Sequence, residues 1–383
     1  MTWIVPWIIS HCCFSRHRHR VYDMRQHSET GVIAHEEDDM DRLLVDRDFI
    51  KYVATLERSG SHWDNISSRL GSVLLIGPQW TMYTTEQGKM LQFATNCQDV
   101  WTRDVHPLVI DAWYSMGLPT LGITPQVEAI SQPMPVTSGL IAQFNLTISE
   151  QDLEKCIAKG GSIRFMVIPE MAGYLPAAAD AGSVTVYEAL LIGRRLVHVL
   201  TLLHRNGVIH RNISPDSVWV RGIAEVQLID FSRAGIGSYE GFGDELFGMS
   251  PWELENPARV RTRRDDVWRA LRVVAILMHG KRFEEYERFV LEQHGMEYFN
   301  WWKFSGDIFA IPVSNPIVQA AVRPARTDII SPYPYIMRGF RKIMQAIACI
   351  DSNQQIGDYQ KIIDSFDNHI LPYVVHETRG ASK

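Results

Sequence analysis

The sequence of 383 residues has few cysteines, no excess of basic residues and no long apolar run. Its five cysteines, at positions 12, 13, 97, 156 and 349, lack the spacing of metal ligands, so we expect reduced thiols rather than a disulfide framework. A formal net charge of -6 argues against nucleic-acid binding as the main role, because that work usually needs a basic surface. No segment reaches the roughly 18 consecutive apolar residues of a membrane span.

The N-terminal segment also lacks the order of a signal peptide. A short apolar stretch, "MTWIVPWIIS", comes first, and the basic run "RHRHR" follows it. Cys12 and Cys13 lie between the two, so palmitoylation there would give a membrane anchor with two signals. The alternative is a disordered or misassigned tail. We expect a cytoplasmic location by default, and secretion if the start of the chain is misassigned.

The composition is that of an ordinary globular protein, with 46% hydrophobic and 21% charged residues. Eleven tryptophans imply large buried clusters. The first part of the chain is polar and contains the acidic run "HEEDDMDR". The next part, from about residue 69 to about residue 170, favours strands in "SVLLIG", "WTMYTT", "KMLQFAT" and "IRFMVIPEM", and Gln87-Gly88 predicts a hairpin turn between two of them.

From about residue 172 the pattern becomes helical. Apolar residues at positions 196, 199, 200 and 203 mark one face of a helix, which Asn206-Gly207 would end. A second helix begins after Arg264 and ends at Gly280. A strand-rich half before a larger helical half predicts an α+β chain with two lobes, and ligand clefts commonly lie between such units.

The segment "GVIHRNISPDSVWV", Gly207 to Val220, follows the first helix. Two short strands, "VWV" and "VQLID", flank the turn "RGIA", and "DFSRAG" comes next. This order resembles the protein kinase superfamily, in which His-Arg-Asp-Leu-x-x-x-Asn precedes a strand pair and Asp-Phe-Gly. Four residues match directly: His210, Arg211, Asp230 and Phe231.

Two later elements extend the resemblance. The run "SPWELE" resembles the Ala-Pro-Glu element, with Glu253 as its glutamate, and "DDVW" resembles the start of the long buried kinase helix. The resemblance implies that Asp266 in this second run braces the catalytic loop. It also implies a bilobal protein-kinase-like fold, with an N-terminal extension (1–60), a small antiparallel-sheet N-lobe (61–170) and a larger helical C-lobe (171–383).

Several residues that kinase chemistry needs are altered in the loop. The carboxylate that accepts the substrate hydroxyl's proton is replaced by Asn212, whose amide cannot take that proton at neutral pH. The metal-binding asparagine is replaced by Ser217, a weaker oxygen ligand, whereas Asp230 keeps the carboxylate that would hold magnesium. The resemblance thus gives Asn212, His210 and Arg211 as the catalytic-loop positions, and Asp230 and Ser217 as candidate metal and nucleotide ligands.

The strand-rich half departs further from the kinase pattern. The run "RLGSVLLIG" has only Gly71 and Gly77 in place of a glycine-rich phosphate loop, and Gly71 is the candidate nucleotide contact. Counting along the third strand places Ala94 at the phosphate lysine. Lys89 lies close to the turn and is expected to be a solvated turn residue, and Lys51 is a displaced alternative.

The acid that pairs with the phosphate lysine is also missing. Residues 97 to 127 contain no glutamate, so Asp104 or Asp111 would have to substitute. Losing several charged groups of this kind costs orders of magnitude in rate. The sequence therefore predicts a pseudokinase.

Such a protein would be a kinase-fold interaction or allosteric module with little or no phosphoryl transfer. The alternatives are a divergent active protein kinase that phosphorylates Ser/Thr, and a nucleotide-binding switch; both would need ATP and magnesium. The expected partners are proteins, such as an active kinase or another signalling protein. Within the superfamily, "HRNISPDSVWV" and "SPWELEN" resemble the secreted rhoptry-type kinases and pseudokinases.

Overall fold

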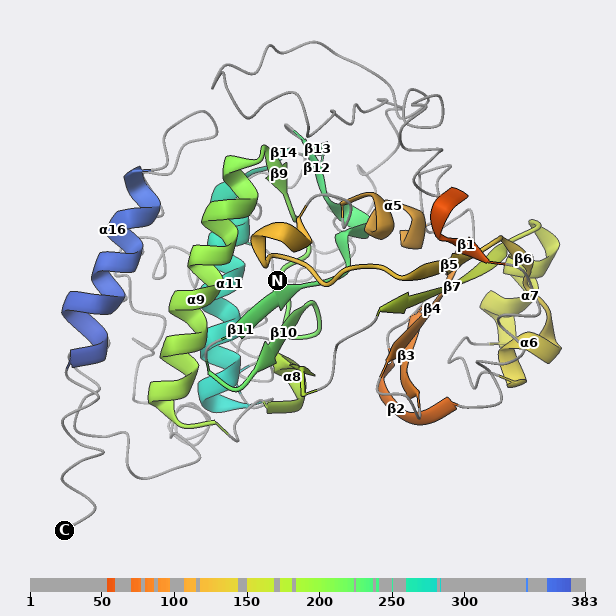
Figure 1. Cartoon of the computed structure of the whole chain (residues 1–383), viewed down its shortest axis with the longest axis horizontal. Coiled ribbons are helices and arrows are strands. Elements are labelled where there is room, and N and C mark those ends of the chain that lie inside the picture. Colours follow the sequence, from red (N-terminus) through yellow and green to blue (C-terminus); the bar gives the residue numbers. More distant parts are fainter. Residues whose placement is uncertain are drawn as a thin grey trace, which may run out of the picture.

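The chain adopts a mixed α+β fold, in which a strand-rich part precedes a helical part (Figure 1). A computed structural model describes residues 54–58, 70–76, 80–85, 89–96, 107–114, 118–143, 150–168, 173–180, 184–223, 225–236, 239–240, 250, 260–280, 283, 342–343 and 357–372. Every structural statement below concerns these residues.

A seven-stranded sheet forms the strand-rich part. Its strands are β1 (Glu57–Arg58), β2 (Leu70–Ile76), β3 (Trp80–Thr85), β4 (Met90–Asn96), β5 (Ala129–Ser131), β6 (Met134–Pro135) and β7 (Ser162–Ile168). The order is β1-β5-β7-β4-β3-β2, with β6 paired to β7, and only the β1–β5 pair is parallel. The four strands and the β3–β4 hairpin expected from the sequence are confirmed. Strand β1 adds residues from the predicted N-terminal extension.

Side chains on the two faces of the sheet belong to two apolar clusters, because successive residues of a strand point to opposite faces. On β4, Met90 and Ala94 join the larger cluster, whereas Leu91 and Phe93 join a smaller one. Phe93 packs edge-on against Phe165 of β7, with ring centroids 4.4 Å apart. Both faces of the sheet are therefore covered.

Three helices interrupt the stretch that was expected to be strand-rich, and the sequence prediction missed them. They are α5 (Pro107–Tyr114), α6 (Ser138–Gln143) and α7 (Glu150–Ala158). Ile141 of α6 and Cys156 of α7 are buried in the smaller cluster. Cys156 is also disulfide-bonded, so the expectation of reduced thiols is wrong for this residue. Cysteines far apart in sequence can meet in the fold, which spacing along the chain does not reveal.

The helical part is built on α9 (Val186–Arg205), α11 (Arg263–His279) and α16 (Gly357–Ser365), which continues into the π-helical turn η4 (Phe366–Ile370). Helix α9 begins at Thr185, whose backbone N–H donates to Glu188 at 2.7 Å and whose hydroxyl accepts from the Glu188 amide at 3.2 Å. Both predicted helix ends are confirmed, with Gly207 at φ 79° and Gly280 at φ 71°.

Shorter elements connect these helices. They are η1 (Pro119–Leu121), β8 (Leu175–Pro176), α8 (Ala177–Asp180), β9 (Val208–Ile209), β10 (Val218–Arg221), β11 (Glu225–Leu228), η2 (Phe231–Arg233), β12 (Gly235–Ile236), β13 (Tyr239–Glu240) and β14 (Val260–Arg261). The expected β10–β11 hairpin is confirmed. Strand β9, which precedes the loop of residues 210–217, pairs with β12. None of the described helices is both long enough and apolar enough to cross a membrane.

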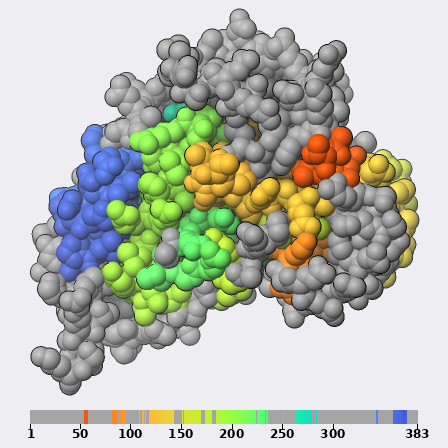
Figure 2. Space-filling model, viewed as in Figure 1, coloured from red at the N-terminus to blue at the C-terminus, as the bar shows by residue number. Residues whose placement is uncertain are grey.

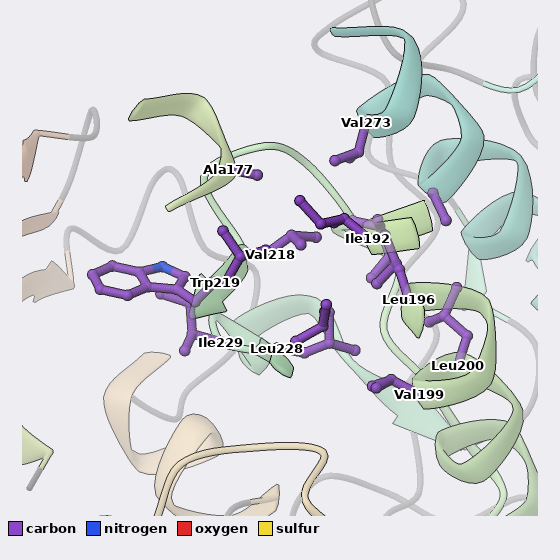
Figure 3. Packing of buried hydrophobic residues seen from close by; sticks show 14 of the residues in the cluster. Ala177, Ile192, Leu196, Val199, Leu200, Val218, Trp219, Leu228, Ile229 and Val273 are labelled. Atoms are coloured by element: carbon purple, nitrogen blue, oxygen red, sulfur yellow. The ribbon is translucent and has the colours of Figure 1, made fainter. Parts of the chain in front are cut away.

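The larger apolar cluster is continuous from the sheet to the helices. It contains Met90 and Ile168 of the sheet, Leu200 of α9 and Trp268 of α11. Figure 3 shows side chains of α9 meeting those of the β10–β11 hairpin, where Trp219 is fully buried. The sheet and the helices therefore share one core, and the loop between β9 and β10 lies against it.

Candidate functional site

The loop of residues 210–217 and the residues that follow β11 come together at the candidate site. The side-chain amide of Asn212 donates from Nδ2 to Oδ2 of Asp230 at 2.6 Å. These are the two positions at which the resemblance implied a catalytic base and a magnesium ligand. Here an amide, and not a second carboxylate, lies against the acid.

His210 ties the same loop to the end of β11. Its Nε2 lies 3.0 Å from the carbonyl oxygen of Ile229, and its Nδ1 accepts from the Asn212 backbone amide at 3.2 Å. Burial lowers the pKa of His210, although the charges of Asp266 and Asp230 act in the opposite direction. The ring is therefore neutral at pH 7, with a proton on Nε2 that the carbonyl accepts.

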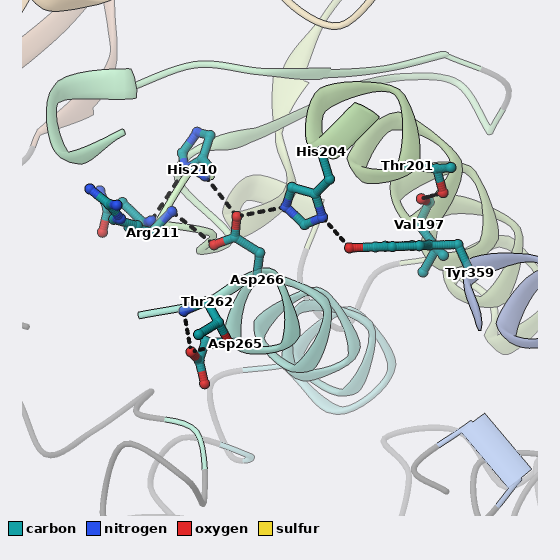
Figure 4. Close-up of polar contacts among 10 residues, drawn as sticks. Val197, Thr201, His204, His210, Arg211, Thr262, Asp265, Asp266 and Tyr359 are labelled. Carbon is teal, nitrogen blue, oxygen red and sulfur yellow. Dashed lines mark hydrogen bonds and ion pairs between the residues drawn. The ribbon is translucent and has the colours of Figure 1, made fainter. Parts of the chain in front are cut away.

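Asp266, in the first turn of α11, holds the start of the loop (Figure 4). Its Oδ2 accepts from the His210 amide at 2.7 Å, and its Oδ1 accepts from the Arg211 amide at 2.8 Å. This is the bracing contact that the resemblance implied. The neighbouring Asp265 instead caps the helix, accepting from the Thr262 amide at 2.6 Å.

Two residues of the site have left-handed backbone conformations, which are uncommon for residues other than glycine. Arg211 has φ 65° and Asp230 has φ 61°. Such conformations persist only where the surroundings fix them. Asp266 fixes the first through its bond to the Arg211 amide. Directly after Asp230, the backbone amide of the next residue donates to a side chain of helix α5.

That amide belongs to Phe231, and it donates to Oδ1 of Asp111. Burial raises the pKa of Asp111 well above its ordinary value, and the charge of Asp230 raises it further, while the Phe231 amide acts in the opposite direction. Asp111 is thus a buried acid that favours its neutral form. Of the two acids proposed from the sequence as substitutes, Asp111 is brought to the site and Asp104 lies outside the described residues.

The phenyl ring of Phe231 is held from both sides. Tyr114 of α5 stacks on it with ring centroids 5.7 Å apart, and the His210 ring lies at 4.6 Å. Phe231 is 1% exposed. Helix α5, the loop and the residues after β11 are therefore locked together.

Ser217 is turned toward the backbone of its own loop. Its hydroxyl lies 2.8 Å from the carbonyl oxygen of Asn212 and accepts from the Ser214 amide at 2.9 Å. Ser217 is 1% exposed. A hydroxyl with one proton and two lone pairs that is engaged in this way is a poor ligand for a metal ion.

Strand β4 brings no cation to the face that meets the main cluster. Ala94 is buried there, and Gln92, two residues earlier, lies on the same face and is also buried. Lys89, expected to be a solvated turn residue, instead pairs with Glu128 at 2.6 Å, with both side chains about one-third exposed. The ammonium group of Lys89, which directly precedes β4, is therefore engaged with the Glu128 carboxylate.

The remaining predicted residues are only partly described. Gly71 lies in β2, where its backbone is part of the sheet. Lys51, Glu253, Cys12 and Cys13 lie outside the described residues. Among the residues that the structure describes, no three or more His, Cys, Asp or Glu side chains are grouped so that they could hold a metal ion.

Sequence reasoning missed one buried participant, Tyr359. Its hydroxyl contacts Nδ1 of His204, whose Nε2 lies 3.0 Å from Asp266. His204 lies near the end of the helix that the sequence predicts before Asn206-Gly207, and so the sequence at least marked its neighbourhood. No motif or spacing signals Tyr359, because it lies about 150 residues further along the chain.

The comparisons with known proteins agree in one respect with this geometry. No family model matches the chain. Among curated proteins, it is similar to the Mus musculus protein described as "Sperm motility kinase Tcr mutant form", with 28% identity over 108 residues. The alignment covers 27% of this chain and 22% of the mouse protein, so the similarity spans about a fifth of that relative's length. It suggests a kinase-like relationship.

Proposed function

We propose that this protein is a pseudokinase: a bilobal kinase-like module that acts by binding a protein partner and transfers little or no phosphate. The observation that carries the proposal is the 2.6 Å hydrogen bond from Asn212 to Asp230. An amide cannot serve as the base, and its N–H group occupies one oxygen of the carboxylate that a kinase uses to hold magnesium.

The other residues of the site fit a magnesium nucleotide poorly. Ser217 is used within the loop, and Ala94 and Gln92 offer no positive charge from β4. Phosphoryl transfer depends almost entirely on positioning and on neutralising phosphate charge. With these groups turned elsewhere, we derive no catalytic step through ATP. The kinase-like arrangement would instead present a fixed surface to a partner.

The core supports the same conclusion. Apolar side chains run without a break from the sheet face at Met90 and Ala94 to α9 and α11. Trp219, on the strand directly after the loop, is fully buried, and its indole nitrogen donates to the Asp216 carbonyl at 3.0 Å. A packed interior of this kind favours a structural role for the loop.

A thermal-shift titration with ATP, with and without magnesium, tests the proposal. A ligand present at about 1,000 times its Kd adds roughly 4 kcal/mol of stability, which gives a clear rise in melting temperature. We expect no rise with 1 mM ATP and magnesium, on the order of 1,000 times a micromolar Kd. A magnesium-dependent rise without phosphate transfer would favour the nucleotide-binding switch, and transfer of radiolabelled phosphate would favour the active kinase.

For location, the disulfide at Cys156 supports the secreted alternative over the cytoplasmic default. Structural disulfides persist in oxidising compartments and are rare in the cytosol. Secretion also agrees with the proposed likeness to the rhoptry-type subgroup. Mass mapping of peptides from the native, unreduced protein would test it: a free thiol at Cys156 in protein purified from its source would contradict secretion.

A further inference from the structure

A buried polar chain connects the C-terminal helix to the loop. Tyr359 of α16, His204 of α9 and Asp266 of α11 are each at most 2% exposed. The Tyr359 hydroxyl contacts Nδ1 of His204, and His204 Nε2 lies 3.0 Å from Oδ2 of Asp266. Figure 4 shows the three side chains in a row, with the loop residues His210 and Arg211 beyond them.

The protonation states follow from the pKa shifts. Burial lowers the pKa of His204 despite the opposing effect of Asp266. Burial would raise the pKa of Asp266, but the hydrogen bond and charge of His204 and the His210 contacts lower it overall. Asp266 is therefore an acceptor, and the neutral imidazole donates from Nε2. Nδ1 is then left as an acceptor, which the Tyr359 hydroxyl satisfies.

The Asp266 carboxylate, which can only accept, requires the Nε2–H tautomer of His204, and the Tyr359 hydroxyl donates to the remaining nitrogen, Nδ1. Without the hydroxyl, the buried Nδ1 loses its donor, and the ring is no longer held from that side in its position against Asp266. Asp266 is the residue that holds the loop, through the amides of His210 and Arg211. Because Arg211 has a left-handed conformation, that hold is needed to keep the loop in shape.

Helix α16 and η4 are fixed on α9 by a second set of contacts. Arg194 donates to the carboxylate of Asp367 through Nε at 2.5 Å and through an Nη nitrogen at 2.7 Å. Phe366 of η4 also packs beside Gly193 of α9, at an ordinary contact distance of 3.5 Å from where a Cβ would lie, whereas the close approach of 2.3 Å that requires glycine is to Val274 of α11. Figure 2 shows α16 alongside α9 at the surface of the molecule.

We propose that Tyr359 is a positioning residue for the loop of residues 210–217, and that the C-terminal helix thereby controls the loop's conformation. Tyr359 acts through His204 and Asp266 and does not itself contact the loop amides that Asp266 binds. A partner that pulls α16 away from α9 would withdraw the hydroxyl and loosen the loop. This inference does not depend on whether the protein transfers phosphate, since it concerns what fixes the loop.

The test is Tyr359→Phe, which removes only the hydroxyl. We expect the His210 and Arg211 amides to exchange with solvent at least about tenfold faster, because local opening becomes easier. We also expect the Nε2–H proton of His204 to exchange faster in NMR experiments, because its hydrogen bond to Asp266 opens more often. The control is Thr201→Val, which removes another buried hydroxyl of the same region, one that donates to the Val197 carbonyl at 2.8 Å within α9.

The control should leave exchange of the two loop amides and of the His204 Nε2–H proton as they are in the wild type. If Tyr359→Phe also leaves both unchanged, the proposal is wrong. Should Tyr359→Phe fail to fold, Asp367→Asn weakens the docking of α16 at a side chain that is 38% exposed. Faster exchange of α16 amides together with the loop amides supports the proposal, and faster exchange in α16 alone overturns it.

Discussion

Replacing Asn212 by aspartate would restore the carboxylate that this loop lacks, but we expect the variant to be inactive and less stable. In the wild type, Nδ2 of Asn212 donates to Asp230 at 2.6 Å. In Asn212→Asp that donor is lost, and two carboxylates face one another. Asp111 is a third acid nearby, since the charge of Asp230 raises its pKa.

The size of the effect can be bounded from these contacts. A hydrogen bond to a charged group contributes about 1.5–3 kcal/mol. Two like charges about 4 Å apart repel by about 4 kcal/mol at an effective dielectric constant of 20, but uptake of a proton by one carboxyl limits this cost. We therefore expect Asn212→Asp to lose about 2–4 kcal/mol of unfolding free energy at pH 7.

The loss should depend on pH with a definite sign. Repulsion raises the pKa of the carboxyl pair in the folded variant above the ordinary value of about 4. The folded variant then binds more protons than the unfolded chain, so its stability falls as pH rises above about 4 and recovers as pH falls. The difference from the wild type should be largest at pH 7 and smaller at pH 5.

Urea denaturation at both pH values measures this, with Asn212→Ala as the matched control. The alanine variant loses the same hydrogen bond without adding a charge, and so it should be less sensitive to pH. A urea midpoint for Asn212→Asp equal to that of the wild type at pH 7 would refute the reasoning. Robust transfer of labelled phosphate by this single variant would refute the pseudokinase proposal itself.

Other variants test the remaining contacts. Asp266→Ala should lower the denaturant midpoint more than Asp230→Ala, because it leaves two loop amides and His204 without their acceptor at about 1–3 kcal/mol each, and equal midpoints would contradict this. The raised pKa of Asp111 makes the wild type lose stability as pH rises above about 4, so Asp111→Asn should gain stability relative to it as pH rises from that value; parallel pH profiles would count against this. A reductant should lower wild-type stability by about 2–4 kcal/mol but leave Cys156→Ser unchanged, and identical effects on both would show that the disulfide does not stabilise the fold.

Much of the secondary structure could be predicted because local patterns determine it. The β3–β4 hairpin combines two runs with high strand propensity and a short turn, and α9 combines a periodic apolar face with a terminal glycine. Helices α5, α6 and α7 were missed, since each is short and its apolar face is only clear beside the sheet. The disulfide at Cys156 was missed for a related reason: it depends on which segments meet in space.

The site was predictable where a motif fixes the spacing. The resemblance to the kinase pattern implied the loop residues His210 to Asn212 and the bracing role of Asp266, and the structure shows Asp266 bound to the His210 and Arg211 amides. Pairing across the fold did not follow from them. The sequence offered Asp104 and Asp111 as equals; the structure places Asp111 at the Phe231 amide, whereas Asp104 lies outside the described residues. Ser217 was predicted as a weak metal ligand, and its engagement with the loop backbone could not be read from its position in the motif.

The altered residues are consistent with one another, and this argues against a kinase silenced by one substitution. With Ala94 in β4, no cation is supplied from that position to an acid on α5, and Asp111 is instead buried and favours its neutral form. A shift of the Asp111 pKa in this direction favours the form that does not repel Asp230. Asp230 in turn accepts the Asn212 amide, which supplies a donor where a kinase would place a metal. Restoring the kinase-type residue at position 94 or at position 212 alone leaves the remaining contacts of the site arranged for the altered residues. We therefore expect phosphate transfer to need at least the double change Asn212→Asp and Ala94→Lys, because a base accelerates only a phosphate that is already positioned and neutralised.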